Sequence, residues 1–550
     1  MSTDSQARIR FDARDWRALA LLLAGWFALP LLLGTGARIP LNDDWAYAHT
    51  VRTLLESGEF RRPSWTWVPA LTHTAWGALF AKLLGFGFPA LRWSSLVAGA
   101  FGIAGTFTLA RRAGAATVAA ALLAAAYGFN PVHVHLGFTF MTDTLFIALC
   151  VWSLVFLAEY TRSSGWGALA AGIACAVAAT LSRQTALVLP AAFLLALLIS
   201  RPLDWRAWLG AALCAGIVGG LYLQTEHWLF ETGGRWSRLY SVRDAGKFIA
   251  SGQSAADFHF VKHGLATLVL TGWFLAPVLL RIVAPLKLRL AAGAIGAAAA
   301  AFVILRLQLP LPPSYNVIWD VGLGPLTIAG TEFLPHAPAW LWWALTLVGA
   351  AAGAELIALL LWRGLPDWRT WRKRGDILLL LAFATGFLLP HLARAPFFDR
   401  YLFTLVAPLG AALIAIAGGA AGPGWRKHAA VAASALFIAF AFVGTRDYLV
   451  RSEAKWALLE ALRAEGYGER VVVGGVEYNG WYDDFDPIER SPGNKFVWDE
   501  EFILTYAPQH ERFAPYAERS YRRWLPPGDE RVYVLRRTAK QSQPVGGLSR

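Results

Sequence analysis

The chain has 550 residues, of which 56% are hydrophobic and only 16% are charged. A composition this apolar excludes a set of ordinary soluble domains and indicates a protein that crosses a membrane many times. The net charge of +13 does not indicate nucleic-acid binding, because most Lys and Arg residues punctuate apolar runs, as basic loops do in membrane proteins. Cys150, Cys175 and Cys214 lie inside apolar segments, so the sequence shows no disulfide framework or metal cluster.

The N-terminus is basic, with Arg8, Arg10, Arg14 and Arg17, and the first long apolar segment follows at about residues 18–33. This segment lacks a small-residue cleavage site, so we expect it to be retained as a signal anchor. A helix of ~20 apolar residues can cross the hydrocarbon core of a bilayer. On this basis the sequence predicts thirteen spanning helices, at residues 18–36, 92–110, 115–132, 145–160, 166–182, 186–200, 207–223, 263–281, 289–306, 339–362, 377–392, 401–420 and 429–444.

Basic residues are concentrated in alternate loops. If the N-terminus is cytoplasmic, then Arg111-Arg112, the basic run 363–374 and Arg426-Lys427 all fall in cytoplasmic loops, whereas residues 307–341 contain no Lys or Arg. Loops rich in Lys and Arg stay on the cytoplasmic side. The pattern predicts a multi-pass protein of the bacterial cytoplasmic (inner) membrane with an extracytoplasmic C-terminal domain. Counting residues 66–86 as a further span would invert every later loop, so we predict a helix at 69–84 that lies in or dips into the outer interface.

The first predicted outer loop, roughly 37–91, contains two adjacent carboxylates, Asp43 and Asp44. Asn42 can cap a helix over residues 43–57 that Gly58 ends. Acids in the first turn of a helix stabilise its dipole by about 0.3–1 kcal/mol, which is one explanation of the pair. The other is functional, because ionised groups beside a bilayer are costly and are kept mainly where they act. Tyr47, one turn further on, favours the functional explanation.

The second outer loop ends in Phe140-Met141-Thr142-Asp143, directly before another apolar helix. Asp143 could simply cap that helix, or it could meet Asp43 and Asp44 in one outer cavity. Clustered carboxylates raise one another's pKa, which helps to hold one of them ready as a base. His133 and His135 in the same loop could join a metal site, although lone loop histidines are more often solvated.

Two arginines lie at predicted outer helix ends. Arg183 joins two short apolar segments, where it could bind a ligand or merely extend its charged end to the interface. Arg400, in Phe398-Asp399-Arg400-Tyr401, has a planar fork of donors suited to a phosphate, the alternatives being an ion pair with Asp399 or a lipid headgroup contact.

Two further outer loops, 224–262 and 307–338, are long and rich in aromatic, Gly and Pro residues, which is typical of lids or binding loops. After residue 444 the composition becomes that of a soluble domain. We predict a membrane domain at 1–444, a small α/β domain at 445–537 and a disordered tail at 538–550. The α/β domain is expected to contain a helix at 451–466, strands at 470–473, 502–506 and 532–535, and an exposed loop at 477–482.

These residues together resemble the GT-C superfamily of membrane glycosyltransferases, in particular the protein O-mannosyltransferase and aminoarabinose-transferase-like group. Asp43-Asp44-x-x-Tyr47 is similar to that group's Asp-Glu-x-x-Tyr, and Phe140-Met141-Thr142-Asp143-Thr144 and Arg400-Tyr401 match its later motifs. The resemblance covers about residues 1–444. Two positions depart from it: Asp44 stands where Glu is usual, and Val68-Pro69-Ala70-Leu71 replaces a Lys- or His-Pro-Pro-Leu sequence common near the donor phosphate.

The resemblance implies an all-α polytopic membrane protein that uses a polyprenyl-phosphate-linked sugar donor. It also implies that Asp43 is the catalytic acidic residue and that Asp143 shares its cavity. The chemistry of the residues agrees, because transfer from a lipid phosphate needs a base for the acceptor proton and positive groups for the departing phosphate. Arg400 and Arg183 could supply those positive groups.

The sequence therefore predicts a hexosyl- or pentosyltransferase that acts with inversion, through a carboxylate base, on a lipid, glycan or protein acceptor at the outer face of the membrane. No metal ligands are predicted and no cofactor is certain, but a divalent cation assisting the arginines stays open. The alternative is a transporter or flippase, which would tend to place ionisable residues mid-membrane and to show repeated halves. The residues predicted to be catalytic are Asp43, Asp44 and Asp143, and those predicted to bind substrate are Tyr47, His73, Arg183, Arg400 and Tyr401.

Overall fold

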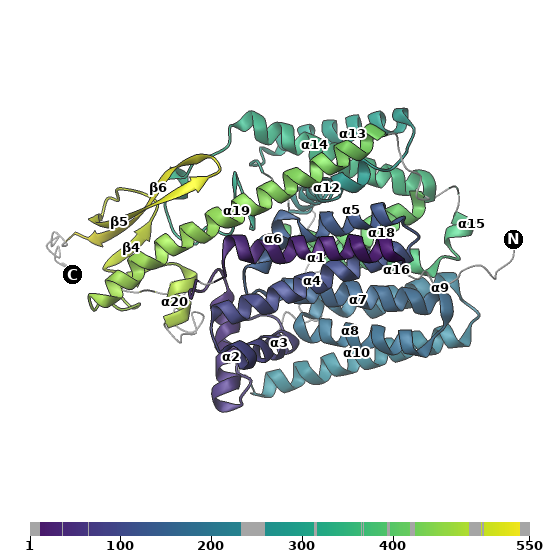
Figure 1. Ribbon diagram of the computed structural model, residues 1–550, viewed down its shortest axis with the longest axis horizontal. Helices are drawn as coiled ribbons and strands as arrows, with labels where there is room; N and C mark the ends of the chain where they lie inside the picture. Colours follow the sequence, from purple (N-terminus) through teal and green to yellow (C-terminus); the bar gives the residue numbers. More distant parts are fainter. Residues whose placement is uncertain are drawn as a thin grey trace, which may run out of the picture.

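The computed structural model is a long bundle of helices with a small sheet domain at one end (Figure 1). We call this end the domain end, and the end near the N-terminus the opposite end. The structure describes residues 11–35, 37–63, 65–232, 259–312, 316–364, 366, 368–392, 397–417, 424–482, 497 and 500–538. All of the predicted tail except Thr538, and most of the predicted outer loop 224–262, lie outside these residues.

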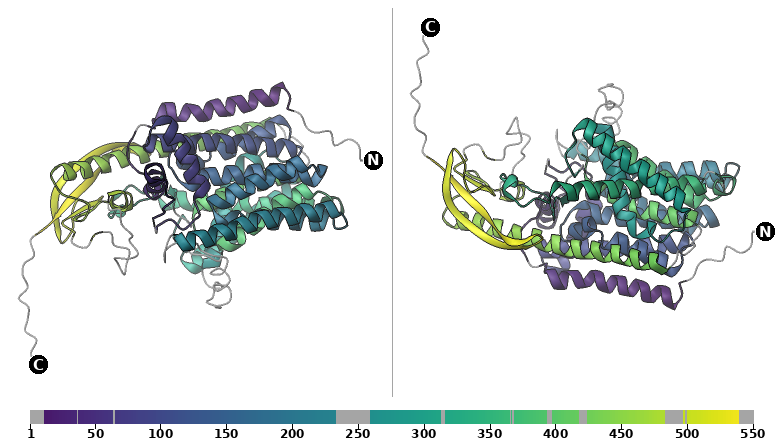
Figure 2. Two further views of the ribbon diagram at one scale, coloured as in Figure 1. Left: turned by 90° about the horizontal axis from the view of Figure 1, so that it is seen from below. Right: turned by 90° about the horizontal axis from the view of Figure 1, so that it is seen from above.

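The bundle consists of helices that run between the two ends (Figures 1 and 2). Its long helices are α1 (Ala13–Leu33), α4 (Phe88–Arg112), α7 (Thr142–Ser163), α10 (Trp205–Thr232), α12 (His259–Leu279), α13 (Leu286–Leu307), α14 (Ala339–Gly364), α16 (Gly375–Leu392) and α19 (Gly424–Ala464). The shorter ones are α5 (Thr117–Gly128), α6 (Pro131–Gly137), α8 (Trp166–Ser182), α9 (Val188–Ser200), α15 (Trp368–Trp371), α17 (Asp399–Phe403) and α18 (Val406–Ala417), with a 3₁₀ turn η1 (Gln184–Leu187).

Each of the thirteen predicted spans coincides with a helix, but not all of these helices are long enough to cross a bilayer alone. Among the described residues, ten helices are long and apolar enough to span, or eleven if α5 and α6 form one span bent by 58°. The predicted spans 166–182 and 186–200 correspond to shorter apolar helices, Trp166–Ser182 and Gln184–Ser200. By length and composition, the described residues thus provide ten or eleven spans and not thirteen, because α8 and α9 are short.

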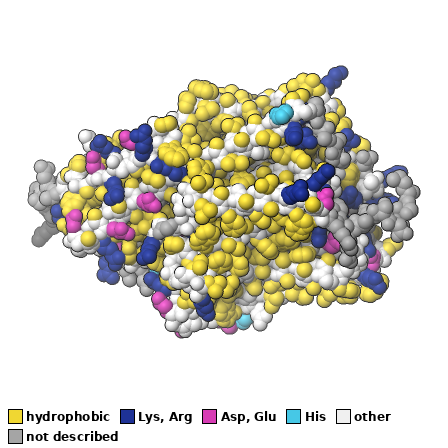
Figure 3. Space-filling view, viewed as in Figure 1, with side chains coloured by type: hydrophobic (Ala, Val, Ile, Leu, Met, Phe, Trp, Pro, Cys, Tyr) yellow, Lys and Arg dark blue, Asp and Glu magenta, His cyan; other side chains and the backbone are white. Residues whose placement is uncertain are grey.

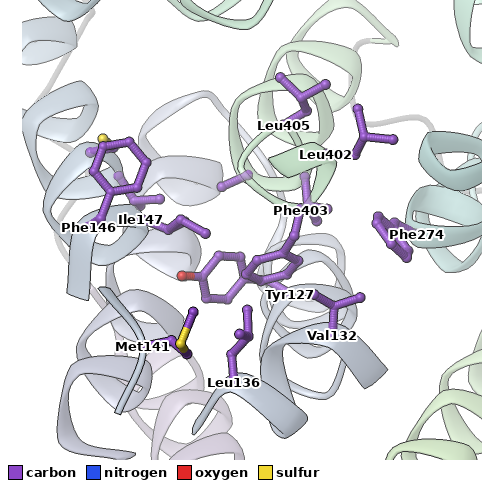
Figure 4. Close-up of a cluster of buried hydrophobic side chains, with 14 of the residues drawn as sticks. Tyr127, Val132, Leu136, Met141, Phe146, Ile147, Phe274, Leu402, Phe403 and Leu405 are labelled. Carbon is purple, nitrogen blue, oxygen red and sulfur yellow. The ribbon is translucent and has the colours of Figure 1, made fainter. Parts of the chain in front are cut away.

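Hydrophobic side chains cover the middle of the face shown in Figure 3, and charged side chains gather toward the two ends. Inside the bundle, Tyr127, Val132, Phe146, Phe274 and Phe403 belong to one buried cluster that joins five helices (Figure 4). This cluster fixes α6, α7 and α17 relative to one another. These three elements carry or adjoin the polar residues considered below.

Two short helices, α2 (Asp44–Ser57) and α3 (Leu71–Leu84), pack together at the domain end (Figure 1). The predicted helix at 69–84 is therefore present and has only 14 residues. The helix predicted from Asp43 begins one residue later, with Asp43 as its N-cap, because Asn42 adopts a left-handed conformation with φ of 57°. Gly58 ends α2 in the left-handed conformation, as predicted.

The connection between α13 and α14 carries a two-residue hairpin, β1 (Ile318–Trp319) and β2 (Gly322–Leu323), and a 3₁₀ turn, η3 (Thr331–Phe333). Gly324 has φ of 86° and lies against the Tyr448 ring, so close that a Cβ atom there would be 2.1 Å from it. At Ala329 the segment pairs with Thr505 of the sheet domain. The predicted outer loop 307–338 is therefore attached both to the bundle and to the C-terminal domain.

Helix α19 runs unbroken for 41 residues from the bundle into the C-terminal domain (Figure 2). The predicted span 429–444 and the predicted helix 451–466 are parts of this one element, so residue 444 marks a change of composition and not a break in structure. The sheet has the order β3-β4-β6-β5, with β3 (Val472–Val473) parallel to β4 (Phe502–Thr505) and the other pairs antiparallel. The long hairpin of β5 (Phe513–Trp524) and β6 (Pro527–Arg537) extends beyond the predicted strand at 532–535.

The segment predicted as an exposed loop at 477–482 is a helix, α20 (Val476–Tyr482), that packs on α2. His49 of α2 has Nε2 3.1 Å from the Trp481 carbonyl oxygen. A Cβ atom at Gly480 would lie 2.4 Å from the Trp45 ring, so only glycine allows this close approach. The C-terminal domain is therefore in direct contact with the helix that follows Asp43 and Asp44.

Candidate active site

Asp143 is the centre of a group of buried charges at the domain end. It lies in the first turn of α7, and its Oδ1 accepts a hydrogen bond from Arg183 Nη1 at 2.5 Å. Its Oδ2 lies 3.8 Å from Arg400 Nη1. Arg183 ends α8 and Arg400 lies in α17, so three separate elements meet here. The N-cap of α7 is Met141, and Asp143 serves as an ion-pair partner instead of the cap that the sequence left open.

The two arginines share an aromatic face. The Arg183 and Arg400 guanidinium carbons lie 5.5 and 5.7 Å from the centroid of the Tyr401 ring. Cation–π contacts of this kind hold a guanidinium in place without using its N–H donors. Tyr401 therefore positions both arginines while leaving donors available for a ligand.

Several charged atoms of this group are buried and have no hydrogen-bond partner among the described residues: Arg400 Nε and Nη1, Arg183 Nε and Asp143 Oδ2. Buried polar atoms in folded proteins are normally satisfied, so each exception asks for an explanation. Guanidinium donors that converge from two sides suit the oxygens of a phosphate, which accept bidentate hydrogen bonds. The arrangement suits an anion, because several guanidinium donors beside Asp143 are available for hydrogen bonds to a ligand.

Asp43 is half-buried and lies close enough to this group to interact with it electrostatically. Its Oδ1 accepts a hydrogen bond from Trp65 Nε1 at 2.9 Å. Burial raises the pKa of the Asp43 carboxyl above its ordinary value, with smaller upward contributions from Glu477 and Asp143 and an opposing one from Arg400. A raised pKa makes a carboxylate a stronger base once it is ionised. As the N-cap, Asp43 makes no capping hydrogen bond with its side chain.

Asp44 is placed differently, although it is the next residue. Its side chain is fully buried, with Oδ1 accepting from the Phe140 backbone N–H at 2.8 Å and Oδ2 from that of Leu41 at 3.3 Å. Burial raises the pKa of Asp44 to about 7. Both of its oxygens are used to join the two predicted outer loops. The geometry therefore favours Asp43 as the reacting carboxylate and Asp44 as the residue that positions it.

Tyr47 and His73 pack against each other near the group of buried charges. The Tyr47 ring packs edge-on against the His73 ring at 5.3 Å, and His73 stacks on Phe140 at 4.1 Å. Burial raises the pKa of Tyr47 to about 12, so its hydroxyl stays neutral at physiological pH. Burial lowers the pKa of His73 to about 4, so this imidazole is also neutral and adds no positive charge to the site.

Three residues of this region were not found from the sequence. Trp65 holds Asp43, as described above. Asp399 accepts hydrogen bonds from the backbone N–H groups of Val317, Ile318 and Arg400, at 3.1, 2.6 and 2.7 Å. It therefore ties β1 to α17 instead of pairing with the Arg400 side chain. The adjacency of Asp399 to Arg400 was the only signal in the sequence.

The third is Glu477, which α20 of the C-terminal domain contributes. It is buried, it forms an ion pair with Lys455 of α19, and its Oε1 accepts from Thr327 Oγ1 at 2.7 Å. Its Oε2 is buried and has no hydrogen-bond partner among the described residues. No sequence pattern links position 477 to Asp43, because their electrostatic interaction depends on how α20 docks.

His133 and His135 are neither solvated nor gathered with other ligands. Both are buried in α6, where the His133 ring stacks on Trp26 at 4.8 Å and on Phe403 at 5.0 Å. His135 packs against Tyr448. Within the described part of the chain, no group of three His, Cys, Asp or Glu side chains could hold a metal ion.

Comparison with known proteins bears on this geometry. Residues 70–223 match the family model described as dolichyl-phosphate-mannose-protein mannosyltransferase, a segment that includes His73, Asp143 and Arg183. The structure is similar to that of ArnT from Cupriavidus metallidurans bound to undecaprenyl phosphate, with a TM-score of 0.51 and 13% sequence identity, covering 95% of this chain and 98% of that one. The chain has the GT-C fold. The resemblance predicted from the motifs is thereby confirmed.

Two other solved structures are similar at lower scores. ArnT from the same organism in the apo state gives a TM-score of 0.40 at 15% identity, covering 94% of this chain and 97% of that one. Arabinosyltransferase EmbB from Mycobacterium smegmatis gives 0.35 at 14%, covering 82% of this chain and 43% of that one. No curated protein matches the chain in sequence. The family match covers residues 70–223 alone, and the similarity to ArnT, at 13% identity, is one of fold.

Proposed function

We propose that the protein transfers a sugar from a polyprenyl-phosphate donor to an acceptor at the outer face of the bacterial cytoplasmic membrane, with inversion at the anomeric carbon. The observation that supports this proposal is the set of Arg183 and Arg400 donors that have no hydrogen-bond partner among the described residues. Their donors without partners converge beside Asp143, next to the half-buried Asp43. This combination provides a place for a phosphate and, within the same region, a carboxylate that can accept a proton.

In the proposed reaction, an acceptor nucleophile (a hydroxyl or similar group) attacks the anomeric carbon of the donor sugar. The bond from that carbon to the acceptor atom forms while its bond to the phosphate oxygen breaks, and the bonding electron pair leaves with the polyprenyl phosphate. Asp43 takes the proton of the acceptor group. A positioned general base contributes about 10²–10⁴-fold to such a step.

The departing phosphate gains negative charge, which Arg400 and Arg183 stabilise from fixed positions. The ion pairs with Asp143 and the contacts with Tyr401 hold both guanidinium groups before the donor binds, so little reorganisation is needed. Asp143 is proposed to orient the arginines and to act on Asp43 through its charge. Tyr47 and His73, both neutral, are proposed to line the sugar-binding side.

The fold offers a suitable arrangement for a lipid donor. ArnT, whose fold is similar, was solved with undecaprenyl phosphate bound. The site proposed here lies at the end of the bundle, where a phosphate group can reach the arginines while its hydrocarbon chain stays in the membrane. A multi-pass protein with its C-terminal domain outside the cytoplasm would bring donor, acceptor and Asp43 to the same face.

The test is release of polyprenyl phosphate by the purified, full-length protein in lipid nanodiscs. Undecaprenyl-phosphate sugars carrying mannose, glucose or 4-amino-4-deoxyarabinose would be supplied with an outer-membrane lipid extract as acceptor. We expect undecaprenyl phosphate and a glycosylated product to form together, and neither to form with Arg400→Ala. Donor that crosses the bilayer of a proteoliposome without being cleaved would instead establish the transporter alternative.

A further inference from the structure

A polar cavity lies outside the Arg183–Arg400 site, in the segment between α13 and α14. Its volume is about 570 Å³, within the ~300–1,000 Å³ typical of small-molecule sites. The apolar part of its wall includes Leu326 and the Trp319 ring, and the polar part includes Asn316, Thr331, Glu332 and His336. Neither the family match, which ends at residue 223, nor the proposed transfer reaction gives this cavity a role.

The wall of the cavity is fixed by one buried carboxylate. Asp320 accepts hydrogen bonds from His336 Nδ1 at 2.7 Å, from the Ala337 N–H at 2.9 Å and from Trp342 Nε1 at 2.9 Å. These bonds join the β1–β2 hairpin to the start of α14. A wall held by three such bonds is organised before any ligand arrives, which lowers the entropic cost of binding.

The cavity is also connected to the proposed reaction centre through the backbone. Asp399 binds the N–H groups of Val317 and Ile318, and Ile318 directly precedes Trp319. The residue after Asp399 is Arg400, which faces the proposed donor phosphate. The same carboxylate therefore holds the backbone just before Trp319 and the backbone N–H of Arg400.

The chemistry of the lining selects a class of ligand. Glu332 and the paired His336–Asp320 give no surplus positive charge, so the cavity does not suit a second phosphate. Asn316, Thr331 and Glu332 provide hydrogen-bonding groups that a hydrocarbon chain could not satisfy. Trp319 is half-buried and offers an aromatic surface beside them, with His336 packed 5.4 Å away. A sugar ring has apolar C–H faces and hydroxyl edges, and it matches a lining of this kind.

We propose that this cavity binds a neutral saccharide unit of the acceptor, stacked on Trp319 and hydrogen-bonded through Asn316, Thr331 and Glu332. This inference rests on the proposed glycosyl transfer and extends it, because it makes the acceptor a glycan or glycolipid. The donor sugar is carried on the phosphate that Arg400 holds. The acceptor saccharide would bind in this cavity while its nucleophile reacts at the donor sugar.

Saturation-transfer NMR on the full-length protein in nanodiscs tests the proposal, with cellobiose, maltose and N,N′-diacetylchitobiose as probes. We expect transfer to the ring protons of at least one disaccharide, reduced at least fivefold in Trp319→Ala and largely retained in Trp319→Phe. Trp340→Ala is the matched control, since Trp340 lies nearby at the start of α14 but is 69% exposed. Binding of none of the probes, or equal binding by Trp319→Ala, would overturn the proposal.

Two further measurements separate this inference from others. Affinity for undecaprenyl-phosphate sugar should be the same in Trp319→Ala and wild type, whereas a parallel loss would mean that the cavity holds the donor sugar and not the acceptor. Saccharide binding requires no turnover. Failure of the transfer assay would therefore refute the proposed function and leave the binding result unaffected. Failure of the saccharide-binding assay would refute the acceptor site and leave the transfer result unaffected. Thermal melting of each variant checks that it is folded.

Discussion

At the end of the bundle opposite the C-terminal domain, Asp376 accepts from Arg374 Nε at 2.9 Å and Arg374 Nη2 at 2.8 Å, and it also pairs with Arg162. At the domain end, Asp143 likewise meets two arginines, yet its Oδ2 and three guanidinium nitrogens of Arg183 and Arg400 have no hydrogen-bond partner among the described residues. Helices α7 and α16 extend toward both groups, so the two share a scaffold. When every charged atom of a buried cluster is hydrogen-bonded within the protein, the cluster can be explained by structure alone. When some of these atoms lack a partner, they are available to bind a ligand.

The same contrast holds for a second pair of carboxylates. Asp15 at the opposite end accepts from Thr117 Oγ1 at 2.7 Å and pairs with Arg111 at 2.8 Å. Among the described residues, the Asp43 carboxylate at the domain end accepts a single hydrogen bond, from Trp65. The comparison separates two explanations that a sequence cannot distinguish, since both ends present acids and arginines beside apolar helices. The predictions below test whether the two ends differ in function as they differ in bonding.

The largest expected effect concerns sidedness, because the two ends should face different compartments. In a variant without Cys150, Cys175 and Cys214, a cysteine at exposed Ser520 of β5 should react with a membrane-impermeant thiol reagent in spheroplasts. A cysteine at exposed Thr370 of α15 should react only after the membrane is opened. Labelling of position 370 alone in intact spheroplasts would reverse the orientation and place the proposed site in the cytoplasm.

Removal of the proposed base should have the next largest effect. Asp43→Asn keeps the size of the side chain and a hydrogen-bond acceptor for Trp65, but it cannot take the acceptor's proton. Turnover should fall by about 10²–10⁴-fold while donor affinity is retained. The readouts are the rate of polyprenyl phosphate release and, separately, donor binding.

Asp44→Asn is the matched comparison at the neighbouring position. An asparagine there can accept from only one of the two backbone N–H groups that Asp44 binds, so we expect loss of folded protein with smaller loss of turnover per folded molecule. If Asp44→Asn is stable but inactive while Asp43→Asn has normal turnover, the general base is Asp44 and not Asp43. Normal turnover in both would end the assignment of this loop to catalysis.

The opposite end should respond in stability and not in chemistry. Asp376→Ala leaves Arg162 and Arg374 without their shared partner, and breaking a buried ion pair in this way costs about 3–5 kcal/mol. The midpoint of thermal unfolding in detergent should fall clearly below that of wild type. Turnover of the remaining folded protein should be close to normal, and a specific loss of turnover would contradict the structural role.

Exchange of arginine for lysine should discriminate between the two ends more finely. Arg400→Lys keeps the charge but loses the planar fork, so donor binding should weaken by roughly 10–100-fold, the loss of one charge-assisted hydrogen bond. Arg374→Lys is the control and should leave donor binding unchanged. Unchanged affinity and turnover in Arg400→Lys would reduce Arg400 to an ion-pair residue.

The sequence predicts those elements of the fold that local hydropathy determines, and it misses those that depend on pairing with distant parts of the chain. Hydropathy located the long helices of the bundle but not the short α6 and α15. The motif at Asp43 was found because it follows the first apolar segment, and those at Asp143 and Arg400 because each lies at the start of an apolar segment. Helix α19 was divided in two because hydropathy changes near residue 444 while the helix continues. Strand β5 was missed because charged residues such as Glu518 and Arg522 interrupt its apolar pattern, although it is paired along its length with β6.

The roles within the site required the fold. Asp43 and Asp44 are equivalent in sequence, and only the Phe140 and Leu41 backbone contacts distinguish them. Trp65 and Glu477 are 22 and about 430 residues from Asp43 along the chain, and neither separation follows any local pattern. Contacts of this kind depend on how α2, α20 and the loop before α3 pack, which periodicity does not encode.

The smallest predicted effect tests whether the C-terminal domain acts on the base. Asp43 must be ionised to accept a proton, and its pKa is raised, so turnover should fall as the pH drops through a value above the ordinary aspartate pKa. Glu477 contributes to that raised pKa by its negative charge. In Glu477→Gln the charge is absent, while the new amide oxygen can still accept from Thr327 and Lys455. The pKa of Asp43 should therefore fall, and the acid limb of the rate profile should move to lower pH by roughly half a unit or less.

Glu469→Gln makes the same change of charge elsewhere in the C-terminal domain and should leave the acid limb in place. Because the profile is compared between two variants of equal net charge, a general effect of charge on the membrane surface cancels. A shift toward higher pH in Glu477→Gln, or equal shifts in both variants, would show that Glu477 does not reach the base. Glu477 would then serve, through its Oε1 contacts with Thr327 and Lys455, only to hold α19 and α20 against the segment between α13 and α14.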